Sequence, residues 1–398
     1  MSDSLPDEIV TQILLRLPIK SIITSICVCK TWKSIIQNPT FISSHLHHST
    51  TTNNHNLLLF RLCTQNRKAH IFDIEDPFAP CSDGEIKELY SLHNDDDDFA
   101  EHARFDYFHF QANNYNGASR VVGTCNGLVC LSDNLNTYID KLFLWNPCVR
   151  KFVKIPSPNV EVTFWTYESI GFGFDAKTND YKVARVVTLV DNAHSRKDRP
   201  VVEVYSLSTG EWRMVTALPP ICTLLGREQV GFVNGALHWL AFRRIDDGHK
   251  FHHFVLVFDL GDEVFREILL PELPGYETTY KLEGLVSVYG NCLALFQKEY
   301  NNGQQNIWVM KEYGVASSWT KLLTIPYQGS GVDIPMPIGF RRNGEVMLKM
   351  DDGQLVSVDL GNQKMNNLGI SSYGYTFVDS YVESLVLLDK ATNGAVTY

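Results

Sequence analysis

Residues 142–156 read Leu-Phe-Leu-Trp-Asn-Pro-Cys-Val-Arg-Lys-Phe-Val-Lys-Ile-Pro: an apolar run ending in an aromatic residue, a polar turn, a second aromatic residue and a proline. The same order of residue types recurs around Tyr205, Phe258 and Trp308, and a shortened form ends at Val358. In the first three units the second aromatic residue follows the first by seven positions. Short apolar runs separated by polar turns predict antiparallel strand pairs.

The repeat has a regular period. Its aromatic or β-branched anchors are Trp145, Tyr205, Phe258, Trp308 and Val358, which lie 60, 53, 50 and 50 residues apart. A period of about 50 residues with several strands per unit is typical of the blades of a kelch-like β-propeller. With an atypical first unit that starts at residue 57, the five anchors predict a large all-β domain, an irregular propeller of about six blades. An irregular β-sandwich or barrel with coincidental spacing is the alternative.

A propeller also needs turns between its strands and a closing contact between its first and last blades. Turns that contain Asn and Gly precede several anchors: Asn126-Gly127, Asn234-Gly235, Gly290-Asn291 and Asn343-Gly344. Open sheet edges are prone to aggregation, so a ring gains from closure. We expect Val382–Leu388 to pair with Leu57–Leu62 and close the ring.

The N-terminal part of the chain follows a helical pattern instead. Apolar residues recur at helical spacing from Ile9 to Leu17, Pro18 starts a second segment, and Asn38-Pro39 ends a third that contains Trp32. Three short helices this rich in aliphatic residues expose apolar surface unless a partner covers it. The sequence therefore predicts three parts: a small all-α unit over 1–48, a polar linker over 49–56 and the β-domain over 57–398.

Composition narrows the class of protein. Of 398 residues 44% are hydrophobic, and the formal net charge is −10, which argues against a nucleic-acid-binding surface. No uninterrupted apolar run is long enough for a transmembrane helix, and Asp3, Asp7 and Glu8 stand where a signal peptide needs positive charge. Nine scattered cysteines do not form a disulfide framework. We expect a cytoplasmic protein, with the nucleus as a second location, and no membrane contact.

Few sequence motifs point to a catalytic, cofactor-binding or metal-binding site. No phosphate-binding loop, dinucleotide fingerprint or nucleophile elbow occurs, so we predict no catalytic residues and no cofactor. The histidine groups at 45–48 and 249–253 read as surface clusters without the partners of a metal site, so no metal is predicted. Two polar stretches are candidate recognition loops: one contains Asp95, Asp96, Asp97 and Asp98, and the other, over 191–200, contains His194 and Arg196. The acidic run reads first as a solvated loop, and second as a surface that steers a basic partner.

Specific blocks resemble a known family. The N-terminal part resembles the plant F-box in Leu5-Pro6-Asp7-Glu8-Ile9, Ile13-Leu14-Leu15-Arg16-Leu17-Pro18 and Cys27-Val28-Cys29-Lys30-Thr31-Trp32. The rest resembles the plant F-box-associated domain in Gly123–Cys130, Leu144–Pro147, Gly171–Asp175, Asn234–Trp239 and Ser318–Lys321. The subfamily looks like the S-locus F-box-like group, some of whose members recognise pistil ribonucleases in self-incompatibility.

This resemblance implies a function. The F-box docks on a Skp-type adaptor, which binds a cullin and a RING protein, and the β-domain binds a protein target that is then ubiquitinated and degraded. By position, the implied adaptor contacts are Leu5, Pro6, Ile9, Ile13, Leu14, Leu17, Pro18, Cys27, Val28 and Trp32. Ile22-Ile23-Thr24-Ser25 departs from the family, where Leu-Arg-Phe is frequent, so the adaptor affinity is expected to differ. The alternatives are a propeller enzyme with a helical cap and a binding protein whose F-box does not dock.

Overall fold

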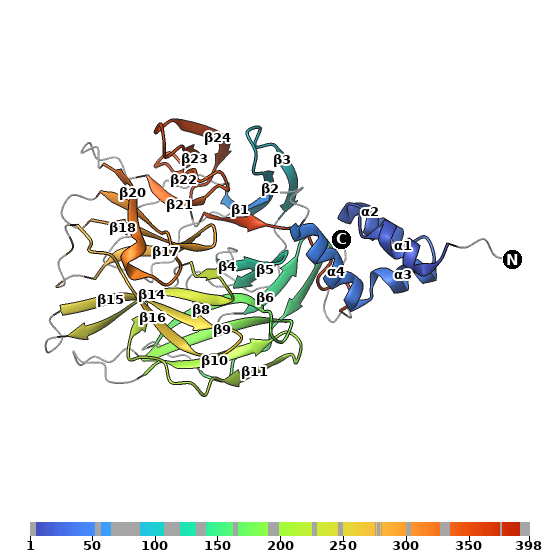
Figure 1. Ribbon diagram of the computed structural model, residues 1–398, viewed down its shortest axis with the longest axis horizontal. Helices are drawn as coiled ribbons and strands as arrows, with labels where there is room; N and C mark the ends of the chain where they lie inside the picture. The colour runs from blue at the N-terminus through green and yellow to red at the C-terminus, as the bar shows by residue number, and fades with distance from the viewer. Residues whose placement is uncertain are drawn as a thin grey trace, which may run out of the picture.

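Four helices project from one side of a ring of β-strands (Figure 1). The computed structural model describes residues 5–51, 57–64, 88–106, 120–132, 141–161, 166–189, 199–224, 229–245, 250–274, 276, 279, 281–299, 304–326, 335–374 and 376–390. The helices are α1 (Asp7–Leu14), α2 (Ile19–Ser25), α3 (Lys30–Ile36) and α4 (Pro39–Thr51). We call them the helical unit.

The fourth helix was not predicted. Asn38-Pro39 ends α3, as expected, but it also starts α4, because the Asn38 side-chain oxygen accepts a hydrogen bond from the backbone N–H of Thr40 at 2.9 Å. Proline suits the first position of a helix, where its missing N–H costs nothing. The helix continues to Thr51, so residues 49–51, predicted as linker, are helical; residues 52–56 lie outside the described residues.

The strands form six antiparallel sheets, which confirms the predicted propeller of about six blades. In order from the innermost strand, the first blade consists of β25 (Phe377–Tyr381), β1 (Leu57–Cys63), β2 (Glu88–Asn94) and β3 (Glu101–Asp106). The second blade consists of β4 (Arg120–Cys125), β5 (Leu128–Ser132), β6 (Leu142–Asn146) and β7 (Lys151–Lys154). The third blade consists of β8 (Thr166–Asp175), β9 (Asp180–Leu189), β10 (Val201–Ser206) and β11 (Glu211–Met214). In the fourth blade β12 (Thr223–Leu224) and β13 (Gly231–Val233) both pair with β14 (Ala236–Ile245), which is followed by β15 (Lys250–Asp259) and β16 (Phe265–Leu269). The fifth blade consists of β17 (Glu283–Tyr289), β18 (Cys292–Lys298), β19 (Gln305–Met310) and β20 (Trp319–Ile325). The sixth blade consists of β21 (Met336–Phe340), β22 (Val346–Lys349), β23 (Gln354–Val358) and β24 (Met365–Ser371).

The seven-residue spacing of the repeat is the register of one hairpin. Each anchor lies on the third strand of its blade, and in the second, third and fourth blades the second aromatic residue faces it on the fourth strand, as for Tyr205 with Trp212 and Phe258 with Phe265. The ring centroids of these two pairs are 5.6 and 4.8 Å apart. Facing aromatic pairs of this kind stabilise a hairpin by about 0.2–1 kcal/mol relative to a pair of alanines. In the fifth blade Trp308 faces Lys321, and Trp319 faces Met310, so the seven-residue spacing is visible only in the three blades that contain the aromatic pair.

The ring closes one segment earlier than predicted. The strand that pairs with β1 is β25, with Leu57 facing Tyr381 and Arg61 facing Phe377, so the prediction for Val382–Leu388 is wrong. Leu385, Val386, Leu387 and Leu388 instead form a buried turn that packs into the same apolar core as the helical unit. The run is apolar because it lies between two parts of the molecule, and not because it is a strand.

The blades have two different ends. Strands alternate in direction, so the turns between first and second strands and between third and fourth strands lie at one end, and the remaining connections lie at the other. Ser49 and Thr50 of α4 line a cavity together with first-to-second turn residues such as Asn126 and Asn291, which places the helical unit at that end. We call it the helical end and the opposite one the far end.

The helical unit is attached through the segment that follows β25. Asn146, at the end of β6, donates hydrogen bonds from Nδ2 to the carbonyl oxygens of Ser384 at 3.0 Å and Val386 at 2.8 Å. Lys151 Nζ donates to the carbonyl oxygen of Leu388 at 2.8 Å. One apolar core then contains Leu14 and other residues of the helical unit together with Leu385–Leu388 and residues of the second and third blades. The shared core fixes the helical unit against the propeller.

Candidate functional site

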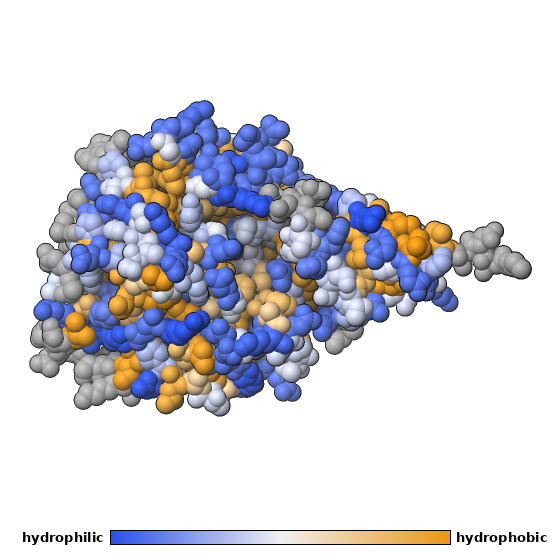
Figure 2. All heavy atoms as spheres, in the orientation of Figure 1, coloured by the Kyte–Doolittle hydropathy of each residue, from blue (hydrophilic) through white to orange (hydrophobic). Residues whose placement is uncertain are grey.

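The first candidate site is the outer surface of the helical unit. Ile9 and Ile13 lie four residues apart on α1 and are 48% and 47% exposed, Leu5 just before the helix is 59% exposed, and Val28 before α3 is 63% exposed. Figure 2 shows hydrophobic atoms gathered at the outer end of this unit. Val10 and Leu14, one position further along the helix, point into the core, so α1 is apolar on more than one side. An apolar surface of this kind on a soluble domain marks an interaction site.

Nine of the ten residues predicted to contact an adaptor have accessible surface. Seven are exposed: Leu5, Pro6, Ile9, Ile13, Pro18, Cys27 and Val28. Leu17 and Trp32 are half-buried and pack against the edge of the core. Leu14 is fully buried between the helices, so its side chain offers no surface to a partner and its assignment as a contact is wrong. Helical spacing alone could not separate Leu14 from Ile13, because both lie among aliphatic neighbours.

The two cysteines of this region differ in role. Cys29 precedes α3 in an extended conformation, and its sulfur accepts a hydrogen bond from the backbone N–H of Trp32 at 3.4 Å. It therefore stands at the N-cap position, which Ser, Thr, Asp or Asn usually occupy. Cys27 is exposed on the turn between α2 and α3, beside Val28.

The acidic run is only partly a solvated loop. Asp95 is buried against Arg341, whose Nε donates to Oδ1 at 2.9 Å, and the backbone N–H of Arg342 donates to Oδ2 at 2.8 Å. This ion pair joins the β2–β3 connection of the first blade to the β21–β22 turn of the last blade. Asp95 is therefore a structural contact across the ring closure, while Asp96, Asp97 and Asp98 are exposed.

Only one of the two predicted recognition loops lies among the described residues. The acidic run connects third and fourth strands, so it lies at the helical end. His194 and Arg196 lie outside the described residues, and their part in recognition stays a prediction.

The predicted histidine surface clusters are wrong for two members. His45 is buried on the inner side of α4, and burial lowers its pKa despite a hydrogen bond to the backbone at Leu17. His253 is also buried; its Nδ1 lies 2.6 Å from the Tyr276 hydroxyl, and its Nε2 accepts from the backbone N–H of Leu282 at 3.1 Å. Burial lowers the pKa of His253 to about 4, so the ring is neutral at physiological pH. Within the described ranges no group of three His, Cys, Asp or Glu side chains is arranged to hold a metal ion.

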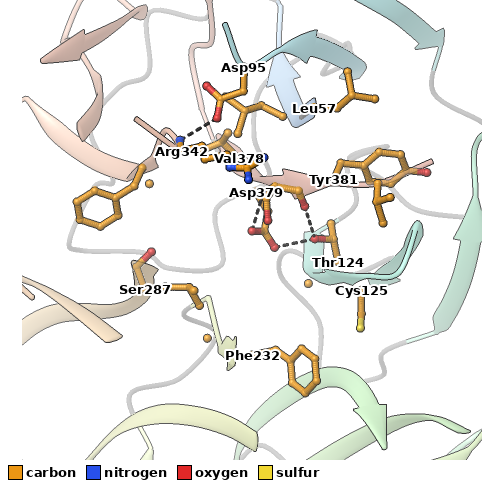
Figure 3. Close-up of a pocket in the computed structure, with 18 of the residues that line it drawn as sticks. Leu57, Asp95, Thr124, Cys125, Phe232, Ser287, Arg342, Val378, Asp379 and Tyr381 are labelled. Atoms are coloured by element: carbon orange, nitrogen blue, oxygen red, sulfur yellow. Dashed lines mark hydrogen bonds between the residues drawn. The ribbon is translucent and has the colours of Figure 1, made fainter. Parts of the chain in front are cut away.

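The second candidate site is a cavity of about 550 Å³ inside the ring, towards the helical end. Residues of the inner strands line it, and Figure 3 shows them around the cavity on different blades: Thr124 and Cys125 of β4, Phe232 of β13, Ser287 of β17, Asp379 and Tyr381 of β25. Cavities of 300–1,000 Å³ with a few convergent polar groups are typical of small-ligand sites.

Asp379 is the charged centre of this cavity. Its Oδ2 accepts a hydrogen bond from the Thr124 hydroxyl at 2.6 Å, and its Oδ1 accepts from the backbone N–H of Ser380 at 2.8 Å (Figure 3). Burial raises its pKa to about 6, and the hydrogen bonds from Thr124 and from the backbone and side chain of Ser380 only partly oppose this. The sequence analysis missed Asp379. The one available signal was a single acid within the apolar run Phe377–Tyr381, and such a residue is also common on an exposed strand.

Comparisons with known proteins agree with this architecture. The family model described as F-box associated beta propeller domain matches residues 89–388, and the F-box domain model matches residues 2–44. This chain belongs to the F-box-associated β-propeller family. The F-box is thus the helical unit, and the β-propeller of this family is the ring of six blades.

Curated relatives from Arabidopsis thaliana match over most of the F-box protein. F-box protein CPR1 is 28% identical over 99% of this chain and 92% of its own length. Another F-box protein is 29% identical over 94% of this chain and 90% of its own, and an F-box/kelch-repeat protein is 28% identical over 81% and 80%. Among solved structures, TolB from Acinetobacter baumannii aligns with a TM-score of 0.43 at 10% identity, over 86% of this chain and 72% of that one. No helix among the described residues of this F-box protein is long and apolar enough to cross a membrane.

Proposed function

We propose that this F-box protein is the substrate-recognition subunit of a cullin-RING ubiquitin ligase. The observation that carries the proposal is the exposed apolar surface of Leu5, Ile9, Ile13 and Val28 on a unit that the F-box model matches. A Skp-type adaptor would cover this surface and link it to a cullin and a RING protein. The setting would be the cytoplasm or nucleus.

The target would bind at the far end of the propeller. Large apolar side chains are exposed there at the ends of the third and fourth blades: Val201, Leu218, Ile221 and Ile245. Leu218 is 75% exposed, more than any other large apolar side chain of the described residues. In this arrangement the F-box and the target surface lie at opposite ends of one rigid body.

The chain itself would not be catalytic. A receptor accelerates transfer by holding a target lysine near the ubiquitin carried by another subunit, which raises the effective concentration of the reactants. Target ubiquitination would then lead to proteasomal degradation. The resemblance to the S-locus F-box-like group makes a pistil ribonuclease the first target to test.

Substitutions on neighbouring positions of α1 test the docking surface. Ile9→Asp with Ile13→Asp places two charges on the exposed surface, so we expect the folded protein to lose at least about 100-fold in adaptor affinity, since an unpaired buried charge costs several kcal/mol. The measurement is co-purification and calorimetry with a Skp-type adaptor. Leu218→Asp, at the far end, is the matched control and should bind the adaptor normally.

Leu14→Asp separates a contact from a core position. Because Leu14 is buried, this variant should unfold the helical unit and lower its thermal stability, whereas Ile13→Asp should leave the circular dichroism of the helices unchanged. If the wild-type protein shows no adaptor binding, the ligase proposal fails and the non-docking alternative replaces it.

Target capture tests whether the far end of the propeller binds the target. A chain that lacks residues 1–48 should trap targets without delivering them for degradation, and Leu218→Asp with Ile221→Asp should remove the captured proteins. Unchanged capture by this double variant would contradict the far-end assignment while leaving adaptor docking intact.

A further inference from the structure

Among the residues that the structure describes, Asp379 lines the cavity and forms no ion pair with a Lys, Arg or His. Arg341, which also lines the cavity, is engaged by Asp95 at 2.9 Å and by Glu345 at 3.0 Å. Arg342 is a second cation in the lining, and its backbone N–H donates to Asp95. The hydrogen bonds to the Asp379 carboxylate come from neutral donors, the Thr124 hydroxyl and the backbone and side chain of Ser380.

The position of Asp379 favours a role in binding a ligand over a role in stabilising the fold. The residue is on the innermost strand of the closing blade, and its carboxylate is drawn in Figure 3 at the centre of the converging side chains. The Phe232 ring lines the same cavity from β13, on the fourth blade. A carboxylate combined with an aromatic ring is a frequent way to bind an ammonium group, because the ring face attracts a cation.

We propose that this cavity binds a ligand with a primary ammonium group, held by the Asp379 carboxylate. The ligand class has two sources: a free aliphatic polyamine, or a lysine side chain of a bound protein. For the second source, the inference rests on the proposed receptor function, because the lysine would belong to the target. The cavity volume of about 550 Å³ accommodates either one.

The charge state of Asp379 makes the binding depend on pH. An ammonium group binds the ionised carboxylate, so affinity is greatest above the pKa of about 6 and falls as the pH drops below it. At pH 5 we expect affinity to be about tenfold weaker than the value at high pH. The other titratable and charged groups around Asp379 are Cys125 on β4, Tyr381 on β25, Glu383 after β25, Arg342 and the Asp95–Arg341 pair. Burial raises the pKa of Cys125, so its thiol stays neutral over pH 5–7.5.

Calorimetric titration of the full-length protein tests the site with two probes, spermidine and acetyl-Gly-Lys-Gly amide. We expect at least one probe to bind at pH 7.5, to bind about tenfold more weakly at pH 5, and to lose at least tenfold in affinity to Asp379→Asn. Asp351→Asn is the matched control, because it removes an exposed carboxylate that does not line the cavity and should bind normally.

The outcomes separate the sources. Binding of spermidine alone assigns the site to a free polyamine, and binding of the lysine peptide assigns it to a protein side chain. Absence of binding by both probes, or equal affinity in wild type and Asp379→Asn, overturns the inference. Adaptor binding is measured on the same samples, so failure of the receptor function is recognised separately.

Discussion

At the scale of single residues, Asp379 is held in an unfavourable state at neutral pH. Its pKa rises from 3.8 to about 6 because burial disfavours the charged form. A rise of this size corresponds to roughly 3 kcal/mol that the folded protein loses when the carboxylate ionises. Sites that bind ligands often retain groups that reduce stability, and Asp379 fits that pattern.

The variant Asp379→Asn should therefore be more stable than the wild type at pH 7.5. The raised pKa means that the protonated carboxyl is compatible with the fold below about pH 3.8 and that the cost develops as pH rises from there through about 6. We expect the melting temperature of the variant to exceed that of the wild type above pH 6 and the difference to vanish below about pH 4. Thermal melts across pH 3.5–8 measure it, with Asp97→Asn as the control. A variant less stable at every pH would show that the carboxylate contributes more as a hydrogen-bond acceptor than it costs as a charge.

At the scale of elements, two Asn-Gly turns with the same backbone conformation have different neighbours. Asn126-Gly127 joins β4 to β5 and Asn234-Gly235 joins β13 to β14, and the two glycines have φ values of +78° and +74°. A side chain at Gly235 would meet nothing within 4 Å, whereas a Cβ at Gly127 would lie 2.4 Å from Ser384 Oγ and 2.6 Å from the Val382 carbonyl oxygen. Only the first turn lies against the segment that carries the helical unit.

A pair of alanine substitutions isolates that contact. Gly235→Ala should cost about 1 kcal/mol, the strain of positive φ alone, because both positions need this conformation. Gly127→Ala should cost about 1–3 kcal/mol more, because Val382 and Ser384 must move away. Urea unfolding of both variants gives the difference. Equal losses would mean that the segment after β25 yields easily and does not hold the helical unit firmly.

At the scale of the whole molecule, one strand from the C-terminal part closes the ring. β25 pairs with β1 along five residues, and Phe377, Val378 and Tyr381 are buried. Three large buried side chains contribute about 5–9 kcal/mol, which is comparable to the total stability of a typical domain. The same closure brings Asp379 into the cavity and leads directly into the turn that attaches the F-box.

A chain that ends at Thr376 should consequently not fold cooperatively. It loses the strand that completes the first blade, and an open edge on β1 favours aggregation. A chain that ends at Lys390 keeps β25 and the attachment segment, so it is the matched control. Tryptophan fluorescence in urea distinguishes the two. If both unfold at the same urea concentration, closure by β25 is not needed for stability.

The repeating parts of this protein could be predicted from local sequence patterns. The seven-residue aromatic spacing, the period of about 50 residues and the helical aliphatic pattern are local signals, because each depends on contacts within one hairpin or one helix. They were enough for the six-bladed ring and the N-terminal F-box. They also predicted that α1 is apolar, and the exposed residues Ile9 and Ile13 are among the predicted adaptor contacts.

Only the tertiary structure decided how those parts meet. The sequence contained no information that Leu14 is buried while Ile13 is exposed, that Asp95 pairs with Arg341 some 246 positions away, or that Leu385–Leu388 forms a turn against the F-box. Each depends on which distant surface arrives beside the residue, and burial and pairing of a side chain follow from that neighbour rather than from its own segment. The cavity around Asp379 arises in the same way, because strands from separate blades must come together before its carboxylate lies beside Thr124 and Phe232 lines the same cavity.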